Sequence, residues 1–310
     1  VLLFSALAIA ISSALIGCGD KSPEQHIESA QQYIQLKDDA AAVIELKSAI
    51  QQAPDNAEAR VLLGRIYLKI GEGVAADKEL TRALKNGAKL TEIAVDLARA
   101  AYLSGVSPSV SLNVDIADES NSNEFIKFYS LLTRFDNGEL NNLATEFAAF
   151  SQETKNDATK NAANAVLSLL NQQNAKAISH LQQINADSPI YWDSQLLLAK
   201  AQLTDGLFKE AITTLKGYVA IATSANFAKL MLAETYVRNN QAADAEPILS
   251  GLLALYPDQP LANYLTAVIA YEDKDFVKAK ELAEKAVNNG FAVPNVRILA
   301  ALAALQQNLN

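Results

Sequence analysis

Residues 40–84 read AAAVIELKSAIQQAPDNAEARVLLGRIYLKIGEGVAADKELTRAL, and this stretch contains the end of one repeat and most of the next. The first repeat covers residues 23–56 and the second covers residues 57–90. Residues of the same type return after 34 positions: Ala30, Tyr33, Ala42, Leu46 and Ala49 are followed by Gly64, Tyr67, Ala76, Leu80 and Ala83. A fixed period of this length is the sequence signature of a repeat protein.

The same frame returns four times in succession, over residues 158–191, 192–225, 226–259 and 260–293. The third of these segments carries Leu232, Ala233, Tyr236, Ala245, Leu249 and Pro257. Four consecutive segments in one register are difficult to obtain by chance. The pattern therefore predicts regular repeats over residues 158–293.

The spacing within each repeat predicts two antiparallel helices. Small residues let two helix backbones approach closely, and a proline ends the second helix. Apolar residues also recur at helical intervals, as in Leu62, Leu63, Ile66 and Tyr67. Because one repeat cannot bury its own apolar face, neighbouring repeats must stack. The expected fold is all-α, a solenoid of antiparallel helix pairs.

Less regular sequence separates an N-terminal array, over residues 23–105, from the later repeats. Residues 91–105 fit a first helix, but residues 106–123 are polar and lack helical periodicity. Residues 124–151 are helical again and predict a degenerate pair with its turn at 136–138, within an irregular region 106–157. Residues 294–310 predict one terminal helix. Its alanine- and leucine-rich surface lacks the polar face of a cap, so we expect it to begin a further repeat.

The composition limits the classes of function. The chain has 310 residues, half of them hydrophobic, with 12 glycines and 8 prolines, which favours helices. A net charge of −9 and the lack of a dense basic block argue against nucleic acid as a partner. A single cysteine excludes an intramolecular disulfide or a multi-cysteine metal site.

The N-terminal residues 1–17, VLLFSALAIAISSALIG, carry no charge and predict a signal peptide. Residues 15–18, LIGC, resemble the lipobox of bacterial lipoproteins. This resemblance implies that Cys18 is lipidated on its sulfur, that the peptide is cut before it, and that the new amine is acylated. Residues 18–22 then form a short tether, and the chain faces the periplasm of a Gram-negative envelope. Gly19, where aspartate would retain a lipoprotein in the inner membrane, favours the outer membrane. The alternative is an unmodified cysteine in an uncleaved membrane helix.

Small residues at the eighth and twentieth positions, an aromatic at the eleventh and alanine at the twenty-seventh resemble the tetratricopeptide repeat (TPR), which implies a right-handed superhelix that binds proteins. The lipobox, IELKSAI in the first repeat and GEGVAADKEL in the second are also similar to the TPR lipoproteins associated with PEP-CTERM proteins and exosortase, the PrsT-like family. That similarity is best over residues 15–105. It implies a role as an adaptor in exopolysaccharide export or in the sorting of PEP-CTERM proteins.

The TPR resemblance implies a concave groove lined by first helices, and it places Arg65 and Arg99 at the ninth position of adjacent repeats. Two neighbouring guanidinium groups can hold a carboxylate in a bidentate manner. One hypothesis is therefore an acidic peptide tail or an acidic polysaccharide as ligand. The alternative is that the two arginines pair with Glu58 and Glu92 of the same wall.

Aromatic residues on first helices extend the candidate groove. Tyr264 and Tyr271 can face it, although packing inside the repeats is the alternative explanation for both. The complete set of candidate groove residues is Arg65, Lys69, Arg99, Tyr102, Tyr264 and Tyr271.

The sequence nominates no catalytic, cofactor or metal site. Its two histidines, His26 and His180, lie in different repeats and lack the paired spacing of metal ligands. Nucleotide-binding and hydrolase motifs are also missing. We therefore expect a binding protein without enzymatic activity. The alternative is a periplasmic component that binds or processes glycan, because two carboxylates can come together from distant positions.

Overall fold

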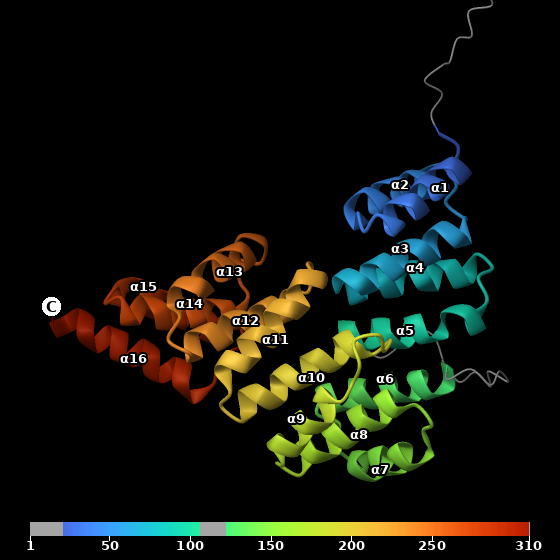
Figure 1. Ribbon diagram of the computed structural model, residues 1–310. Helices are drawn as coiled ribbons and strands as arrows, with labels where there is room; N and C mark the ends of the chain where they lie inside the picture. Colours follow the sequence, from blue (N-terminus) through green and yellow to red (C-terminus); the bar gives the residue numbers. More distant parts are fainter. Residues whose placement is uncertain (1–20, 106–121, 310) are drawn as a thin grey trace, which may run out of the picture.

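The computed structural model describes residues 21–105 and 122–309, and these residues form sixteen α-helices and no strand (Figure 1). The helices are α1 (Pro23–Gln35), α2 (Asp39–Gln52), α3 (Ala57–Ile70), α4 (Gly73–Lys85), α5 (Leu90–Ser104), α6 (Ser122–Asp136), α7 (Leu143–Glu153), α8 (Asp157–Leu170), α9 (Asn174–Gln182), α10 (Tyr191–Thr204), α11 (Phe208–Ile221), α12 (Asn226–Arg238), α13 (Ala242–Leu255), α14 (Pro260–Glu272), α15 (Phe276–Asn288) and α16 (Pro294–Leu309). The predicted signal peptide, Cys18 and most of the irregular segment 106–123 lie outside the described residues.

The helix boundaries follow the 34-residue frame. The first helices α8, α10, α12 and α14 begin at residues 157, 191, 226 and 260, within one residue of the predicted repeat starts. Each packs against the helix that follows it, and successive pairs stack on one another. The predicted all-α solenoid of helix pairs is therefore confirmed.

Small residues occur where two helices meet. Gly64 on α3 faces α4, and a Cβ placed there would lie 2.7 Å from Cγ of Leu80. In the first repeat Ala30, Ala42 and Ala49 have no exposed surface. The recurring small positions thus set the distance between paired helices, as the sequence pattern predicted.

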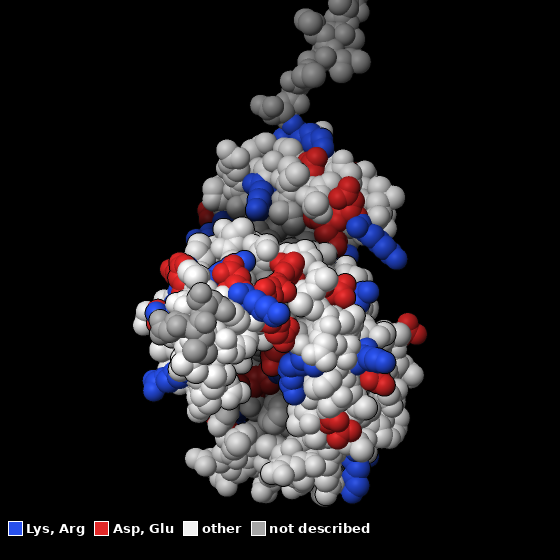
Figure 2. All heavy atoms as spheres, turned by 90° about the vertical axis from the view of Figure 1, so that its left-hand side faces the viewer, with Lys and Arg blue, Asp and Glu red and all other residues white. Residues whose placement is uncertain are grey.

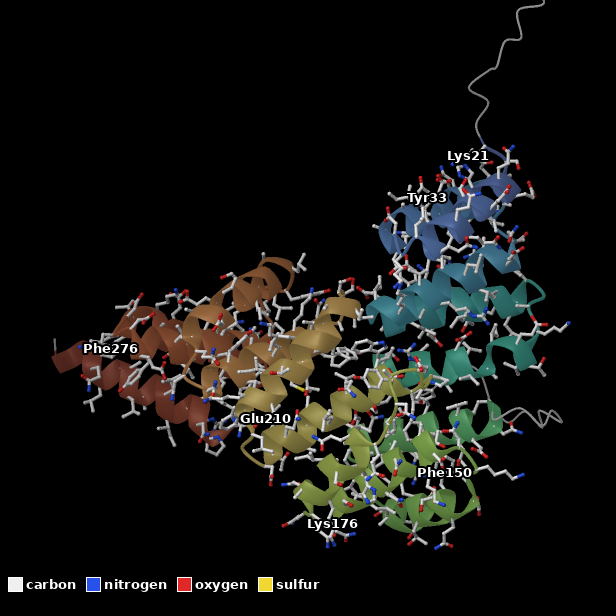
Figure 3. All side chains as sticks on the ribbon, viewed as in Figure 1. Lys21, Tyr33, Phe150, Lys176, Glu210 and Phe276 are labelled. Atoms are coloured by element: carbon white, nitrogen blue, oxygen red, sulfur yellow. The ribbon has the colours of Figure 1, made fainter. Side chains whose placement is uncertain are left out.

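The irregular middle of the chain contains the largest apolar cluster. The predicted degenerate pair is present as α6 and α7, and Gly138 in the turn between them has a φ of +73°. Phe128 of α6 stacks on Phe150 of α7, with ring centroids 6.2 Å apart. Figure 3 labels Phe150 in this part of the molecule. Large aromatic rings therefore contribute to the contact between α6 and α7.

A buried polar side chain secures the turn between repeats at two places. Arg60, four residues into its repeat, donates to the carbonyl of Pro54 from Nε at 2.9 Å and also pairs with Glu79. Asn263 has the equivalent position and donates to the carbonyl of Pro257 at 3.0 Å. Both side chains therefore satisfy a carbonyl that the preceding proline turn leaves without a helical partner.

The stacked helices curl back on themselves, so that α10 and α11 return to the region of α3 and α5 (Figure 1). Two contacts document this return. The amide of Ser224 donates to the carbonyl of Ile70 at 2.9 Å, and Arg99 of α5 pairs with Asp193 of α10 at 2.8 Å. A solenoid in which repeats touch only their neighbours would have neither contact.

The surface carries charges of both signs. Figure 2 shows acidic and basic side chains interspersed among uncharged residues on one face of the molecule. None of the helices in residues 21–105 and 122–309 is long and apolar enough to cross a membrane.

Candidate binding pocket between the two halves of the array

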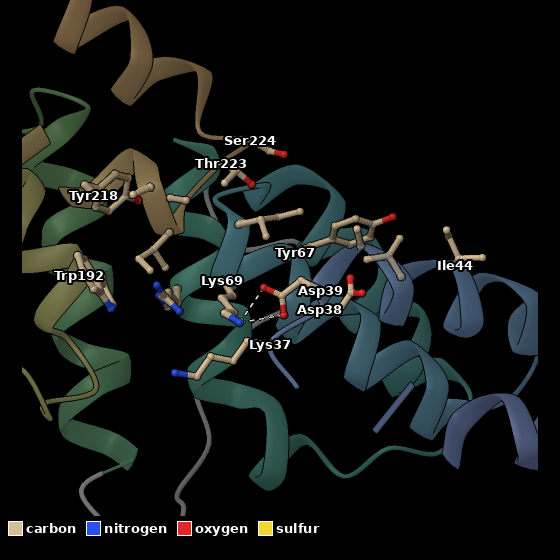
Figure 4. A pocket seen from close by; sticks show the side chains of 17 residues that line it. Lys37, Asp38, Asp39, Ile44, Tyr67, Lys69, Trp192, Tyr218, Thr223 and Ser224 are labelled. Carbon is tan, nitrogen blue, oxygen red and sulfur yellow. Dashed lines mark hydrogen bonds and ion pairs between the residues drawn. The ribbon is translucent and has the colours of Figure 1, made fainter. Parts of the chain in front are cut away.

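The return of α10 and α11 creates a pocket of about 980 Å³ (Figure 4). One wall consists of residues 37–40, Val43 and Ile44, which join α1 to α2 and begin α2, together with the end of α3. The opposite wall consists of Trp192 on α10 and the end of α11 with residues 220–224. Arg99 of α5 also lines the pocket. Two segments far apart in the chain thus enclose one site.

Apolar and aromatic side chains are present on both walls. Ile44, which is 66% exposed, and Tyr67 lie on one side of the pocket, and Trp192 and Tyr218 lie on the other (Figure 4). Ile221 adds a second exposed aliphatic side chain. Exposed apolar surface with a few polar groups is typical of a site that binds a ligand.

Most charges in the pocket are already compensated. Nζ of Lys69 lies 2.7 Å from Oδ2 of Asp39, an ion pair drawn in Figure 4. The carboxylate of Asp38 accepts the amide of Ala41 at 3.0 Å and so caps α2. The pocket therefore contacts an uncharged ligand at a lower desolvation cost than a strongly charged one.

Arg99 belongs to a buried polar network. Its guanidinium donates to both carboxylate oxygens of Asp193, at 2.8 and 3.1 Å. The hydroxyl of Tyr129 donates to the same carboxylate at 2.6 Å. Asp193 has no exposed surface. Burial by itself would lower the pKa of Arg99, but the Asp193 carboxylate raises it above its ordinary value, so Arg99 stays charged.

Tyr102 lies in the core instead of the groove. Only 5% of the residue is exposed, and its ring packs 5.9 Å from that of Tyr129 on α6. Its hydroxyl is buried and has no hydrogen-bond partner among residues 21–105 and 122–309, and burial raises the pKa of that hydroxyl well above 10. Tyr102 does not line a groove as expected, because α6 covers the face of α5 on which Tyr102 lies.

Comparison with known proteins agrees with this architecture. Tetratricopeptide-repeat family models match residues 33–102 and 168–231 in one case and residues 230–295 in another, which together make up more than half of the chain. The chain belongs to the tetratricopeptide-repeat family. The match does not extend to the narrower family associated with PEP-CTERM proteins. No curated protein matches the sequence.

Several solved TPR structures are similar to this TPR chain. A tetratricopeptide repeat protein from Parabacteroides merdae is 16% identical, with 91% of this chain and 98% of that chain covered and a TM-score of 0.45. The TPR domain of P58(IPK) is 15% identical, with 93% and 98% covered and a TM-score of 0.36. Yeast Tom70 is 15% identical, with 93% and 74% covered and a TM-score of 0.36.

The two arginines predicted from the TPR frame do not face one shared ligand site. Arg65 donates to Asp96 at 2.8 Å and to the carbonyl of Glu92 at 3.1 Å, whereas Arg99 is bound to Asp193. The predicted alternative, pairing with the carboxylates of Glu58 and Glu92, differs from these contacts as well. Asp193 belongs to a distant repeat, so its approach to Arg99 is invisible in the local sequence.

The other three candidate groove residues, Lys69, Tyr264 and Tyr271, do not lie in one site. Lys69 lines the pocket, where it pairs with Asp39. Tyr264 packs against Phe291 at 5.4 Å, and Tyr271 packs against Phe276 at 5.3 Å, near the C-terminal end of the array. The two tyrosines therefore make packing contacts of the kind that the alternative explanation predicted.

Sequence reasoning missed the aromatic wall of the pocket. Trp192 is not at a repeat position with a required residue type, and Tyr218 is at the twenty-seventh position of its repeat, where it replaces the alanine that the TPR frame expects. Only the uniqueness of Trp192 in the chain could have drawn attention to it. Among the described residues, no cluster of three or more His, Cys, Asp and Glu is placed to hold a metal ion.

Proposed function

We propose that this TPR protein is a scaffold on the periplasmic side of a Gram-negative envelope, anchored by lipid on Cys18. The lipobox-like sequence LIGC supports the anchor, and Gly19 supports the outer membrane as its location. A lipid anchor with more than one acyl chain retains a protein stably at a membrane. The short segment between Cys18 and Pro23 would keep the repeats close to that membrane.

The proposed activity is the binding of partner proteins, in exopolysaccharide export or in the sorting of PEP-CTERM proteins. The TPR fold typically binds protein or peptide partners. The single observation that carries this proposal is the pocket between α2–α3 and α10–α11. Its apolar walls face each other, and the space between them has a volume of about 980 Å³. That space is large enough for several side chains of a peptide.

Photocrosslinking tests the location of the partner. A benzoylphenylalanine residue replaces Ile44, which lines the pocket and is 66% exposed, and in a control chain it replaces Val74, which is 67% exposed on α4 and outside the pocket. Illumination of cells should give a discrete protein adduct at position 44 and not at position 74. Equal crosslinking at the two positions, or no adduct at position 44, would contradict the proposal.

The aromatic walls also support the alternative, a glycan ligand, because Trp192 and Tyr67 can stack on sugar rings. The same experiment separates the two ligands. Glycosidase treatment shifts a glycan adduct, whereas it leaves a protein adduct unchanged, and tryptic digestion of a protein adduct releases peptides of a second protein. The anchor is tested separately: Cys18→Ala should release the chain from the membrane fraction and abolish the mass of the lipid.

A further inference from the structure

The two walls of the pocket meet at one small contact, which we call the seam. Ile70 and Gly71 at the end of α3 lie against Ser224 and Ala225 before α12. The amide of Ser224 donates to the carbonyl of Ile70, which is among the last four carbonyls of α3 and has no intrahelical partner. Within the described residues, the other main-chain hydrogen bonds outside helices join residues close in sequence.

Glycine at position 71 is required at the seam for two reasons. Its φ of +85° is the left-handed conformation that ends α3, which a residue with a side chain adopts at a cost. A Cβ at this position would also lie 2.6 Å from Cβ and 3.1 Å from Cα of Ala225. The two halves therefore touch here through small residues and without interlocking side chains.

The connection between α5 and α10 is of a different kind. The Arg99–Asp193 pair is bidentate, its carboxylate is fully buried, and the hydroxyl of Tyr129 donates to the same carboxylate. Breaking this pair leaves a buried charge without a partner, whereas opening the seam exposes one amide and one carbonyl to water, which can bind both. The two halves of the array are thus connected strongly by the Arg99–Asp193 pair and weakly by the seam.

We propose that the seam is a conformational switch that opens and closes the pocket. When it opens, α1–α4 move away from α11 and α12, while Arg99 keeps α5 on α10. The pocket exists only in the closed state, because its walls lie on opposite sides of the seam. A ligand that touches both walls therefore shifts the array toward the closed state. This switch concerns the protein itself and does not depend on the identity of the partner.

Trp192 is the only tryptophan in the chain and lines the pocket, so its fluorescence reports on the seam. In Gly71→Ala the added methyl group collides with Ala225 and should open the seam. Acrylamide quenching of Trp192 should then rise about twofold, as expected when local opening exposes a half-buried side chain. Circular dichroism of the same samples should show unchanged helix content.

Gly105→Ala is the matched control. Gly105 ends α5 with a φ of +67°, but a Cβ there meets no atom of the described part of the chain within 4 Å, so this variant has the backbone strain without the collision with Ala225. Its quenching should equal that of the wild type. The double variant Gly71→Ala/Ala225→Gly removes the nearest colliding atom, Cβ of residue 225, and leaves contacts of 3.1 and 3.2 Å to Cα and N of that residue. Its quenching should therefore fall from that of Gly71→Ala toward the wild-type value.

Two results would overturn the switch: wild-type quenching in Gly71→Ala, or an equal increase in Gly105→Ala. If Gly71→Ala does not fold, Ala225→Val tests the same contact from the opposite side. Ala225 has an ordinary φ of −73°, so the larger side chain adds bulk at the seam without left-handed strain. Unchanged quenching in a folded Ala225→Val variant would likewise overturn the proposal.

Discussion

Two classes of buried residue differ in how they relate to the 34-residue frame. Small residues recur at fixed positions of the repeat, whereas polar residues such as Asp193 do not. Ala30, Ala42 and Ala49 have no exposed surface, and the same positions return in later repeats. Buried polar residues such as Asp193 follow no such frame, yet they connect segments that the repeat pattern treats as independent. Such a buried charged residue stabilises the fold only while its oppositely charged partner is present.

Replacement of Arg99 by Met should lower the free energy of unfolding by about 3–5 kcal/mol, because Asp193 would remain buried without its cation. Urea unfolding followed by circular dichroism measures this loss. Arg65→Met is the control, since its ion pair with Asp96 is half exposed and should contribute only about 0–1 kcal/mol. Equal losses in the two variants would show that burial of the Arg99 pair has no special effect.

At the scale of helices, one carboxylate of the irregular pair α6–α7 binds the turn that leads into the regular repeats. Glu124 of α6 accepts the hydroxyl of Thr154 at 2.5 Å and the amides of Lys155 and Asn156 at 3.1 and 3.3 Å. Asn156 in turn caps α8. Glu124 therefore fixes the turn from which the regular array begins.

This arrangement predicts a pH-dependent stability. Burial raises the pKa of Glu124, but the hydrogen bonds from Thr154, Lys155 and Asn156 outweigh it, so the net pKa is below 4.5. The stabilisation is complete above pH 4.5, where the unfolded chain is also ionised, and it is lost as the pH falls through the lowered value.

Glu124→Gln should therefore cost about 1–3 kcal/mol of unfolding free energy at pH 7, and the difference from the wild type should shrink below pH 4.5. Urea titrations at a series of pH values measure it. Glu153→Gln removes a carboxylate whose side chain is 65% exposed and should change little at any pH. A difference that stays constant with pH would exclude ionisation of Glu124 as the cause.

At the scale of the whole molecule, the return of α10 and α11 to α3 and α5 changes the cooperativity of unfolding that is expected of a solenoid. Repeats that touch only their neighbours unfold with limited cooperativity. Here Arg99–Asp193 and the seam connect α3 and α5 to α10–α12. The two halves should therefore unfold together.

In the wild type, urea unfolding followed by Trp192 fluorescence should coincide with unfolding followed by circular dichroism, because both halves contribute to one transition. In Asp193→Asn the two curves should separate, since the connection between α5 and α10 is weakened. Coincident curves in the variant would show that the repeats are coupled through their stacking alone.

The sequence by itself determined the all-α architecture, the 34-residue frame and most helix boundaries. These features depend on residues close in the chain: small side chains at the contact of paired helices, such as Gly64 on Leu80, and turns closed by proline. The degenerate pair α6–α7 was also predictable, because its apolar residues recur at helical spacing.

Only the tertiary structure decided where the candidate site lies. Small rotations accumulate from repeat to repeat, so the turn that meets Gly71 depends on every pair in between, including the irregular one. For this reason Lys69 was the one predicted residue besides Arg99 that lines the pocket, while Trp192 and Tyr218 were missed. The same long-range return buries Arg99 against Asp193, a contact between residues 94 positions apart.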